Sequence, residues 1–350
     1  MMNLPDIHIE NLLDFLTGLL NTPSPTGFTD LGMDYVERAL CQLEGVRVER
    51  TPKGALLARL EGEIGVAPWA VVTHVDTLGA MVKEIKPNGR LKMTSIGGFA
   101  WNTVESEGCT VFTHKGQRYR GSILVTAASS HVHGKRTAEA PRDAESMEVR
   151  LDARTQSAEE TQALGVEVGD FIAFDPRVEV NEGFVRSRHL DNKAGVACVV
   201  AAMQTLVRAH LKPRRTLYAL FSNYEEVGHG ASAGLPADLS ALIVVDMAAV
   251  GEGQTSDEFH ATLCVKDSHG PYDRGLSLRL RHLAEQYQVP YKVDIYPNYG
   301  SDGGAFWRAG GNAPVALIGP GVDASHNYER THVEALVATT RWLLAYALNA

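Results

Sequence analysis

Short apolar runs of strand length alternate with longer amphipathic stretches along most of the chain, and this alternation limits the possible folds. The runs are bounded by Gly, Pro or polar residues and are typical of buried strands, whereas the stretches between them repeat apolar residues at helical spacing. Such alternation predicts an α/β fold with a mixed, mostly parallel sheet and helices on both faces. The expected helices cover residues 7–20, 31–43, 194–208, 276–286 and 333–348, and the expected strands residues 55–60, 69–74, 216–222, 242–246, 292–296 and 315–318.

The sequence changes in character between residues 87 and 176. Gly, Thr and Ser become frequent, long helical patterns are nearly absent, and strand-like pieces recur at residues 108–114, 120–125, 147–151 and 170–174. A chain of 350 residues also exceeds the length at which one core usually keeps growing. We therefore expect a main domain made of residues 1–86 and 177–350, with a small β-rich domain inserted at residues 87–176.

Charge and cysteine content restrict the partners and the compartment. A formal net charge of -9 argues against nucleic acid or an anionic membrane as partner, because both attract basic surfaces. No apolar stretch approaches the ~20 residues that a membrane span requires, and the first residues lack the pattern of a signal peptide. The four cysteines form no C-x-x-C pair and no dense framework. We expect a cytoplasmic protein with reduced core cysteines and a small-molecule or peptide substrate.

Five acidic or imidazole side chains stand at the end of a predicted strand or in the loop after it. They are His74, Asp191, Glu226, Asp246 and His326. Because α/β sheets place their active sites at the carboxyl ends of strands, we expect these side chains to lie close together. Imidazole nitrogens and carboxylate oxygens, without a thiolate, suit a borderline or hard divalent ion such as Zn, Co or Mn. The set predicts a site for two divalent metal ions.

Each of these positions has a simpler explanation when it is taken alone. A His or Asp near a strand end commonly satisfies backbone donors, and Asp191 stands where an apolar helix would take its N-cap, a role compatible with metal binding. Glu225 and Glu226 could form a surface acid pair, but paired acids at the end of a buried strand are costly unless cations or a shared proton neutralise them. Asp76 has the same facing as His74 and is expected to hold that ring or its surroundings in place. The repetition of one pattern at five positions favours the metal site.

In chain order, these motifs resemble those of the tetrahedral aminopeptidase family. This family consists of di-metal peptidases and includes glutamyl and deblocking aminopeptidases and members labelled endoglucanase. The resemblance covers nearly the whole chain. The sequence departs from it at Lys193, where the family commonly has Arg, in the loop of residues 228–232 and in the histidines of residues 129–133. The matching segments are His74–Val75–Asp76, Leu190–Asp191–Asn192, Glu225–Glu226, Val245–Asp246, Ser301–Asp302–Gly303 and Ser325–His326.

The resemblance implies two divalent metal ions per subunit, with zinc expected first and cobalt or manganese as alternatives. Asp191 would bridge the two ions. His74 and Asp246 would complete the protein ligands of one ion, and Glu226 and His326 those of the other.

The resemblance also implies an aminopeptidase that hydrolyses N-terminal residues of peptides through a water bridged by the two metals. Glu225 would be the general base, supported by Asp76. Ser301 and Asp302 would bind the substrate, Asp302 through the free α-amine. Relatives assemble into dimers and tetrahedral cages through the inserted domain, so we expect a homo-oligomer, from a dimer up to a tetrahedral dodecamer.

The sequence is also compatible with other functions. An amidohydrolase or deacylase of the same architecture could act on an acylated amino acid or on a modified dipeptide such as an osmolyte, and a catalytically silent scaffold could keep the metals for stability, although it would not require Glu225. A glycosidase would use Glu225 and Glu226 as acid and base, but adjacent strand residues point to opposite faces.

The sequence assigns no role to His131, His133 or His229, and the first two are expected to lie in a solvated loop. Residues 251–271 are expected to form a long connection beside the substrate pocket.

Overall fold

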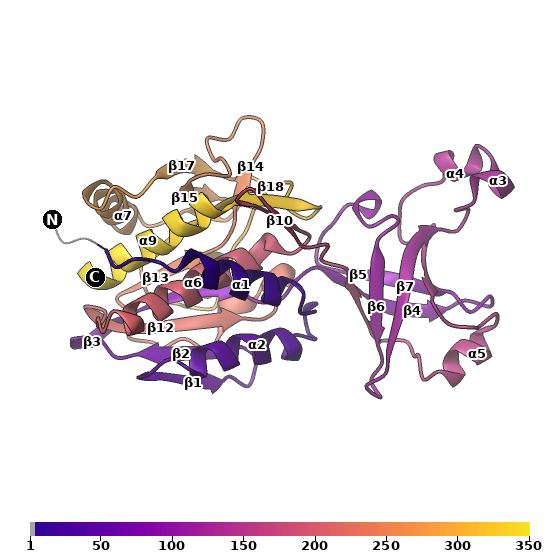
Figure 1. The fold of residues 1–350 in the computed structure, drawn as a ribbon, viewed down its shortest axis with the longest axis horizontal. Helices are drawn as coiled ribbons and strands as arrows, with labels where there is room; N and C mark the ends of the chain where they lie inside the picture. The colour runs from indigo at the N-terminus through magenta and orange to yellow at the C-terminus, as the bar shows by residue number, and fades with distance from the viewer. Residues whose placement is uncertain (1–3) are drawn as a thin grey trace.

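The computed structural model describes residues 4–350, which form two lobes: a large sheet covered by helices, and a closed β-barrel (Figure 1). The four strands at the centre of the sheet run parallel, in the order β12 (Arg215–Ser222), β3 (Ile64–His74), β13 (Ala241–Val245) and β18 (Val315–Asp323). They are buried along most of their length, which explains their apolar sequences, because parallel strands covered on both faces have no solvent side.

Antiparallel strands flank this parallel centre, so the sheet is mixed, as predicted. On one side lie β1 (Val46–Arg50) and β2 (Leu56–Leu60), and on the other β19 (Glu329–His332), β11 (Phe184–Ser187) and β10 (Glu179–Asn181). Four further strands attach to β18 or to one another: β14 (Ala248–Val250), β15 (Ala261–Asp267), β16 (Gly270–Pro271) and β17 (Tyr291–Ile295).

The long helices share one hydrophobic core with one face of the sheet. They are α1 (Ile9–Leu20), α2 (Asp30–Cys41), α6 (Leu190–Arg208), α7 (Arg274–Gln286) and α9 (Val333–Asn349). In the central strands Val71 and Ile243 belong to this core, whereas their neighbours Val72 and Val244 belong to a second core. The second core includes Phe306 of α8 (Asp302–Arg308), so helices lie on both faces, as predicted.

The smaller lobe is a closed barrel of antiparallel strands with an apolar interior, which confirms the prediction of an inserted β-rich domain. Its strands are β4 (Gly79–Ile85), β5 (Leu91–Ile96), β6 (Gly108–Phe112), β7 (Arg118–Val125), β8 (Met147–Leu151) and β9 (Phe171–Phe174). The short helices α3 (Ser130–His133), α4 (Arg136–Glu139) and α5 (Ala158–Ala163) lie outside the barrel (Figure 1). Because β4 belongs to the barrel, we propose that the inserted domain begins at Gly79 rather than at residue 87.

Two smaller expectations were wrong. Residues 251–271 contain β15, a buried strand paired with β18, so they are not simply a connection. Cys41 is exposed at the end of α2, whereas Cys109, Cys198 and Cys264 are buried as expected; all four are free. Among residues 4–350, no helix combines the length and the apolar character needed to cross a membrane.

Candidate metal centre

The parallel strands end at one edge of the sheet, and this edge supplies most of the candidate donors. His74 is the last residue of β3, and its register partner Ser222 is the last residue of β12. Asp246 directly follows β13, and His326 follows the end of β18. Because the strands run in the same direction, residues far apart in the sequence meet at their carboxyl ends.

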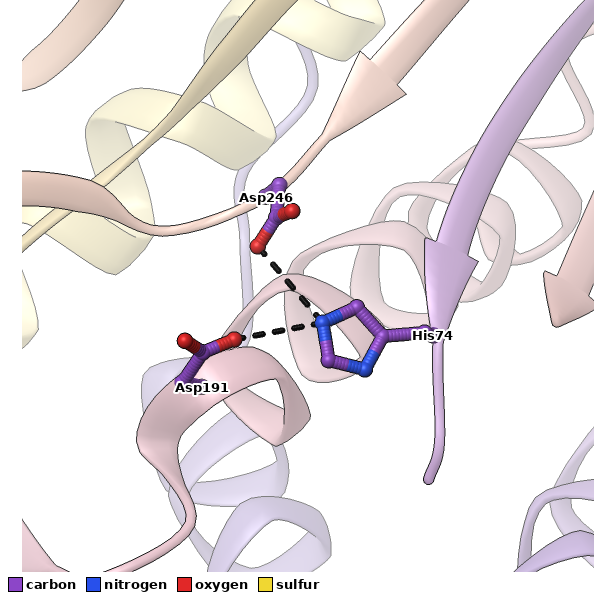
Figure 2. Close-up of side chains that lie close together, drawn as sticks. All are labelled: His74, Asp191 and Asp246. Carbon is purple, nitrogen blue, oxygen red and sulfur yellow. Dashed lines mark hydrogen bonds and ion pairs between the residues drawn. The ribbon is translucent and has the colours of Figure 1, made fainter. Parts of the chain in front are cut away.

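His74, Asp191 and Asp246 form a first group of donors (Figure 2). The Nε2 atom of His74 lies 3.2 Å from Oδ1 of Asp191 and 3.7 Å from Oδ1 of Asp246, and all three residues are buried. The other ring nitrogen, Nδ1, lies 2.9 Å from the backbone carbonyl oxygen of Asp76. If Nδ1–H donates to this carbonyl, Nε2 keeps a free lone pair directed at the two carboxylates, which is the form of the ring that binds a metal.

Asp191, Glu226 and His326 form a second group. The Nε2 atom of His326 lies 3.4 Å from Oδ2 of Asp191 and 3.7 Å from Oε2 of Glu226. Its Nδ1 atom hydrogen-bonds to the carbonyl of Gly98, so Nε2 is again the nitrogen left for a ligand. Asp191 therefore offers one carboxylate oxygen to each group, which is the arrangement that a bridging ligand requires.

The side chain of Asp191 does not cap helix α6. The N-cap of α6 is His189, which makes no capping bond through its side chain, and Asp191 has non-helical backbone angles just inside the helix. Its carboxylate contacts the two imidazoles instead. The simpler explanation of Asp191 as a helix cap is thus not supported.

The chemistry of the donors fits a pair of divalent cations. In each group the donor atoms of all three residues lie within 4.8 Å of one another, and each group combines one imidazole with two carboxylates. The Oε1 atom of Glu226 is buried and has no hydrogen-bond partner among the described residues. A buried carboxylate oxygen without a partner is costly unless a cation or a proton meets it.

Burial and crowding control the protonation of this cluster. Burial, assisted by the charge of Asp191, raises the pKa of Glu226 to about 8. The pKa of Asp191 is lowered although burial acts in the opposite direction, because both imidazoles stabilise its charged form. Burial likewise opposes the charged form of His326, but Asp191 and Glu226 outweigh it and raise the pKa of that imidazole to about 10. The cluster therefore holds protons that a divalent cation would replace.

Glu225 lies beside both groups on the short 3-10 turn η2 (Glu225–Val227). Its Oε2 atom is 3.7 Å from Nε2 of His74, and its side chain lines the same cavity as the donors. Tyr224, with a φ of 73°, turns the chain sharply after β12. Glu225 and Glu226 therefore lie on a turn and not on a strand. The expectation that they point to opposite faces of a strand, which was the reason given against a glycosidase, was wrong.

The carboxylate of Asp76 holds this turn in place. Its Oδ1 atom accepts a hydrogen bond from the backbone N–H of Glu225 at 3.2 Å, and Oδ2 accepts from that of Glu226 at 3.3 Å. The hydroxyl of Thr26 also donates to Oδ2, at 2.7 Å. Asp76 thus contacts the His74 ring through its backbone carbonyl and the acid pair through its side chain.

Glu329 was not predicted from the sequence, although it connects the backbones of two candidate ligands, Asp191 and His326. It is the first residue of β19 and is fully buried. Its Oε2 atom accepts from the backbone N–H of Asp191 at 3.0 Å, and Oε1 accepts from that of His326 at 3.1 Å. A single acid in the polar segment after His326 resembles a surface residue, so the local sequence gave no signal for this role.

The two expected substrate-binding residues lie in different surroundings. Ser301 lines the cavity, and its hydroxyl lies 2.6 Å from that of Tyr272. Asp302 is buried and does not line the cavity; its carboxylate accepts hydrogen bonds from the hydroxyl of Ser222 and, at 2.6 Å, from the backbone N–H of Ala231. The structure therefore brings Ser301, but not Asp302, to the cavity.

The remaining histidines singled out in the sequence do not line this cavity. His131 and His133 belong to α3, outside the barrel, rather than to a loop (Figure 1). The ring of His229 stacks on that of Tyr224, with 5.2 Å between the centroids. Lys193, which stands where the family commonly has Arg, is buried, and its ammonium group donates to the carbonyl of Thr22 at 2.6 Å.

Comparison with known proteins gives consistent matches. Residues 54–342 match the family described as M42 glutamyl aminopeptidase. The chain is 42% identical over 339 residues to the Bacillus subtilis (strain 168) protein named "Putative aminopeptidase YhfE", and the match covers 97% of each protein.

Solved structures with the same fold are also found. The chain is similar to a TET aminopeptidase from a marine sediment archaeon of the Thaumarchaeota, with a TM-score of 0.87, 18% identity and 97% of both chains covered. It is similar as well to the TET1 peptidase of Pyrococcus horikoshii, described as able to assemble into a tetrahedron or a large octahedral shell. That likeness has a TM-score of 0.85 and 20% identity, and it covers 97% of this chain and 100% of the other.

Proposed function

Because the chain belongs to the M42 glutamyl aminopeptidase family, we propose that it is a metal-dependent aminopeptidase that removes N-terminal residues from peptides. The main structural support is the pair of donor groups that share Asp191. His74 and Asp246 would complete the ligands of one ion, and Glu226 and His326 those of the other. Zinc fits these donors best, and cobalt or manganese would also fit them.

The residues around the donor groups suit the hydrolysis of a peptide bond. Two divalent cations, when bound, would polarise the scissile carbonyl and lower the pKa of the attacking water. Glu225 lines the cavity and could accept a proton from that water as its oxygen attacks the carbonyl carbon. When the C–N bond breaks, Glu225 could pass this proton to the departing nitrogen. Burial raises the pKa of Glu225 well above its usual range, which suits a group that must both take and give a proton.

A substrate screen with purified, metal-loaded protein tests this function. We expect hydrolysis of amino-acid p-nitroanilides and of peptides with a free N-terminus. Hydrolysis of acylated amino acids alone would instead identify a deacylase of the same fold. No hydrolysis of any of these compounds, with two metals bound per chain, would favour a silent metal-binding scaffold.

The substitution Glu225→Gln tests the proposed general base. We expect turnover to fall on the order of 10²- to 10⁴-fold, the usual contribution of a positioned base, while metal content measured by mass spectrometry stays the same. Asp191→Ala should lose both turnover and metal. Glu252→Gln, at an exposed loop position, is the matched control and should keep wild-type activity. Normal hydrolysis by metal-loaded Glu225→Gln would remove the base from the mechanism.

We further propose that the protein acts as a homo-oligomer in the cytoplasm. Assembly of the Pyrococcus horikoshii relative into closed shells supports an oligomer, and four free cysteines fit a reducing compartment. Light scattering would place the copy number between a dimer and a tetrahedral dodecamer.

A further inference from the structure

The loop of residues 222–231 carries both acids of the turn after β12, the proposed base Glu225 and the candidate ligand Glu226. Two charged side chains that do not line the cavity, Asp302 and Lys53, hydrogen-bond to this loop. We propose that they are positioning residues, which hold the loop and thereby place Glu225 for catalysis. This inference rests on the proposed aminopeptidase function. It gives Asp302 a role in place of a contact with the α-amine of the substrate.

The carboxylate of Asp302 joins the two ends of the loop. At one end the hydroxyl of Ser222, the last residue of β12, donates to Oδ2. At the other end the backbone N–H of Ala231, in the 3-10 turn η3 (Gly230–Ser232), donates to Oδ1 at 2.6 Å. A Cβ atom on Gly230 would lie 2.2 Å from the same Oδ1 atom, so only glycine lets the loop backbone approach the carboxylate this closely. Because Asp302 is 2% exposed, water cannot readily replace these bonds.

Asp302 is the first residue of α8, a helix that packs tightly against the sheet. The hydroxyl of Ser301, the residue before it, accepts a hydrogen bond from the backbone N–H of Gly303 at 3.1 Å and caps the helix. A Cβ atom on Gly303 would lie 2.8 Å from Cγ1 of Val315 in β18 and 3.1 Å from Cγ2 of Val244 in β13. The carboxylate is therefore fixed relative to β13, and a candidate ligand directly follows that strand.

Lys53 holds the second half of the loop. It lies between β1 and β2, and its ammonium group donates to the carbonyl of His229, to the carbonyl of Gly230 at 2.8 Å and to the hydroxyl of Ser232 at 2.8 Å. These three acceptors match the three N–H donors of an ammonium group. The Nζ atom also lies 5.9 Å from the centroid of the Tyr224 ring, which stacks on the ring of His229. Lys53 thus contacts the loop on both sides of the acid pair.

The middle of the loop has a separate support in Asp76, which accepts from the backbone N–H groups of Glu225 and Glu226. Loss of Asp302 or Lys53 would leave these bonds in place and release the flanking parts of the loop. Four of the five candidate ligands belong to other segments, so we expect zinc to stay bound when it is supplied at saturation. A displacement of about 1 Å at a reacting group can lower the rate about 100-fold. The expected defect is therefore in kcat.

The test measures kcat, KM and zinc content with the amino-acid p-nitroanilide that the wild type hydrolyses best. Asp302→Ala should lower kcat about 10- to 100-fold and leave KM within about twofold, because the base moves and the cavity lining stays. Asp302→Asn should keep kcat within about threefold of the wild type, because the amide oxygen can accept from Ala231 and the NH₂ group can donate to the hydroxyl of Ser222. A carboxylate that bound an α-amine by its charge could not be replaced in this way.

The variants of Lys53 test the second contact independently. Lys53→Met should lower kcat about 3- to 10-fold at unchanged KM and zinc content, since the side chain is far from the substrate but holds the loop. Lys53→Arg keeps the charge and several N–H donors, and it should restore most of the lost kcat. The matched control Lys212→Met, at an exposed position before β12, should behave as the wild type. Should Asp302→Ala fail to fold, Asp302→Asn and the Lys53 pair carry the test.

The outcomes separate the positioning role from the function. Wild-type kcat in Asp302→Ala or in Lys53→Met would overturn the positioning role. A rise in KM of about tenfold or more at unchanged kcat in Asp302→Asn would place the carboxylate at the substrate and overturn that role as well. Each of these results leaves the aminopeptidase intact. No hydrolysis of any p-nitroanilide or free peptide by wild-type protein with two zinc ions bound would overturn the aminopeptidase function and this inference together.

Discussion

Glu329 ties two candidate ligands together through their backbones. Asp191 and His326 are 135 residues apart in the sequence, yet each donates its backbone N–H to one oxygen of the same carboxylate. Residues of this kind orient the ligands without touching the metal, and their loss commonly weakens metal binding. Glu329 therefore fixes the backbones of Asp191 and His326 relative to each other.

We predict that Glu329→Gln lowers the affinity for metal about 10- to 100-fold. The amide has one oxygen, so one of the two backbone N–H groups would face an NH₂ group and the ligand that carries it would move. Titration against a chromophoric chelator measures the affinity. Glu334→Gln, at a side chain that is 68% exposed nearby, should have no effect. An unchanged dissociation constant in Glu329→Gln would show that Asp191 and His326 are held by other contacts.

Among the elements, β18 passes very close to the backbone that follows β13. A Cβ atom on Gly319 would lie 1.6 Å from the carbonyl oxygen of Asp246, and one on Gly321 would lie 1.8 Å from that of Asp257. Since only glycine lacks this atom, β18 can pass directly against the end of β13 and the loop before β15. The position of Asp246 thus depends on a residue of another strand.

We expect Gly319→Ala to lower the free energy of unfolding of the metal-free protein by ~1–3 kcal/mol or more. The added Cβ atom would clash with a backbone carbonyl, so the backbone would have to move, whereas a clash with a flexible side chain could be relieved by a change of rotamer. Urea denaturation measures this change. Gly65→Ala is the control, because nothing lies within 4 Å of its added Cβ atom, and its stability should stay within about 0.5 kcal/mol of the wild type. Equal stability of the two variants would contradict the close packing of β18.

Some strands were not predicted from the sequence, and they differ in how clearly their local sequence marks them as strands. β4 and β5 are joined by a turn that contains Asn88 and Gly89, and Gly89 has a φ of 78°. Asn-Gly between two alternating runs is a hairpin signal, so this pair could have been predicted. β10 is exposed at all three positions, and no apolar pattern marks it. Its strand conformation depends on pairing with β11, a partner that local sequence does not reveal.

In the molecule as a whole, the candidate metal centre touches both lobes. The imidazole of His326 hydrogen-bonds to the carbonyl of Gly98, in the segment after β5 of the barrel. A Cβ atom on the adjacent Gly97 would lie 3.5 Å from Cβ of Glu226. Bound cations would therefore stabilise the junction between barrel and sheet as well as the active site.

We predict that chelation of the metals lowers the midpoint of thermal unfolding. An ion that binds only the folded state raises the free energy of unfolding by about 4 kcal/mol when its free concentration is 1,000 times the dissociation constant. Calorimetry with and without EDTA measures the change, and Asp191→Ala, which lacks the carboxylate that contacts both imidazoles, should show little difference between the two conditions. A midpoint that is insensitive to EDTA in the wild type would contradict stabilisation of the folded protein by bound metal.

The sequence by itself determined the fold class, the presence of a β-rich insertion and the short set of acids and imidazoles from which the candidate site is built. These features follow from local patterns, because hydrophobic period and polar residues at strand ends are visible within a few residues. The tertiary structure decided that Asp191 offers an oxygen to each group, that Asp302 does not line the cavity, and that Glu329 accepts hydrogen bonds from the backbones of Asp191 and His326. Those outcomes depend on strand order, on register and on close contacts between distant segments, and no local pattern encodes such contacts.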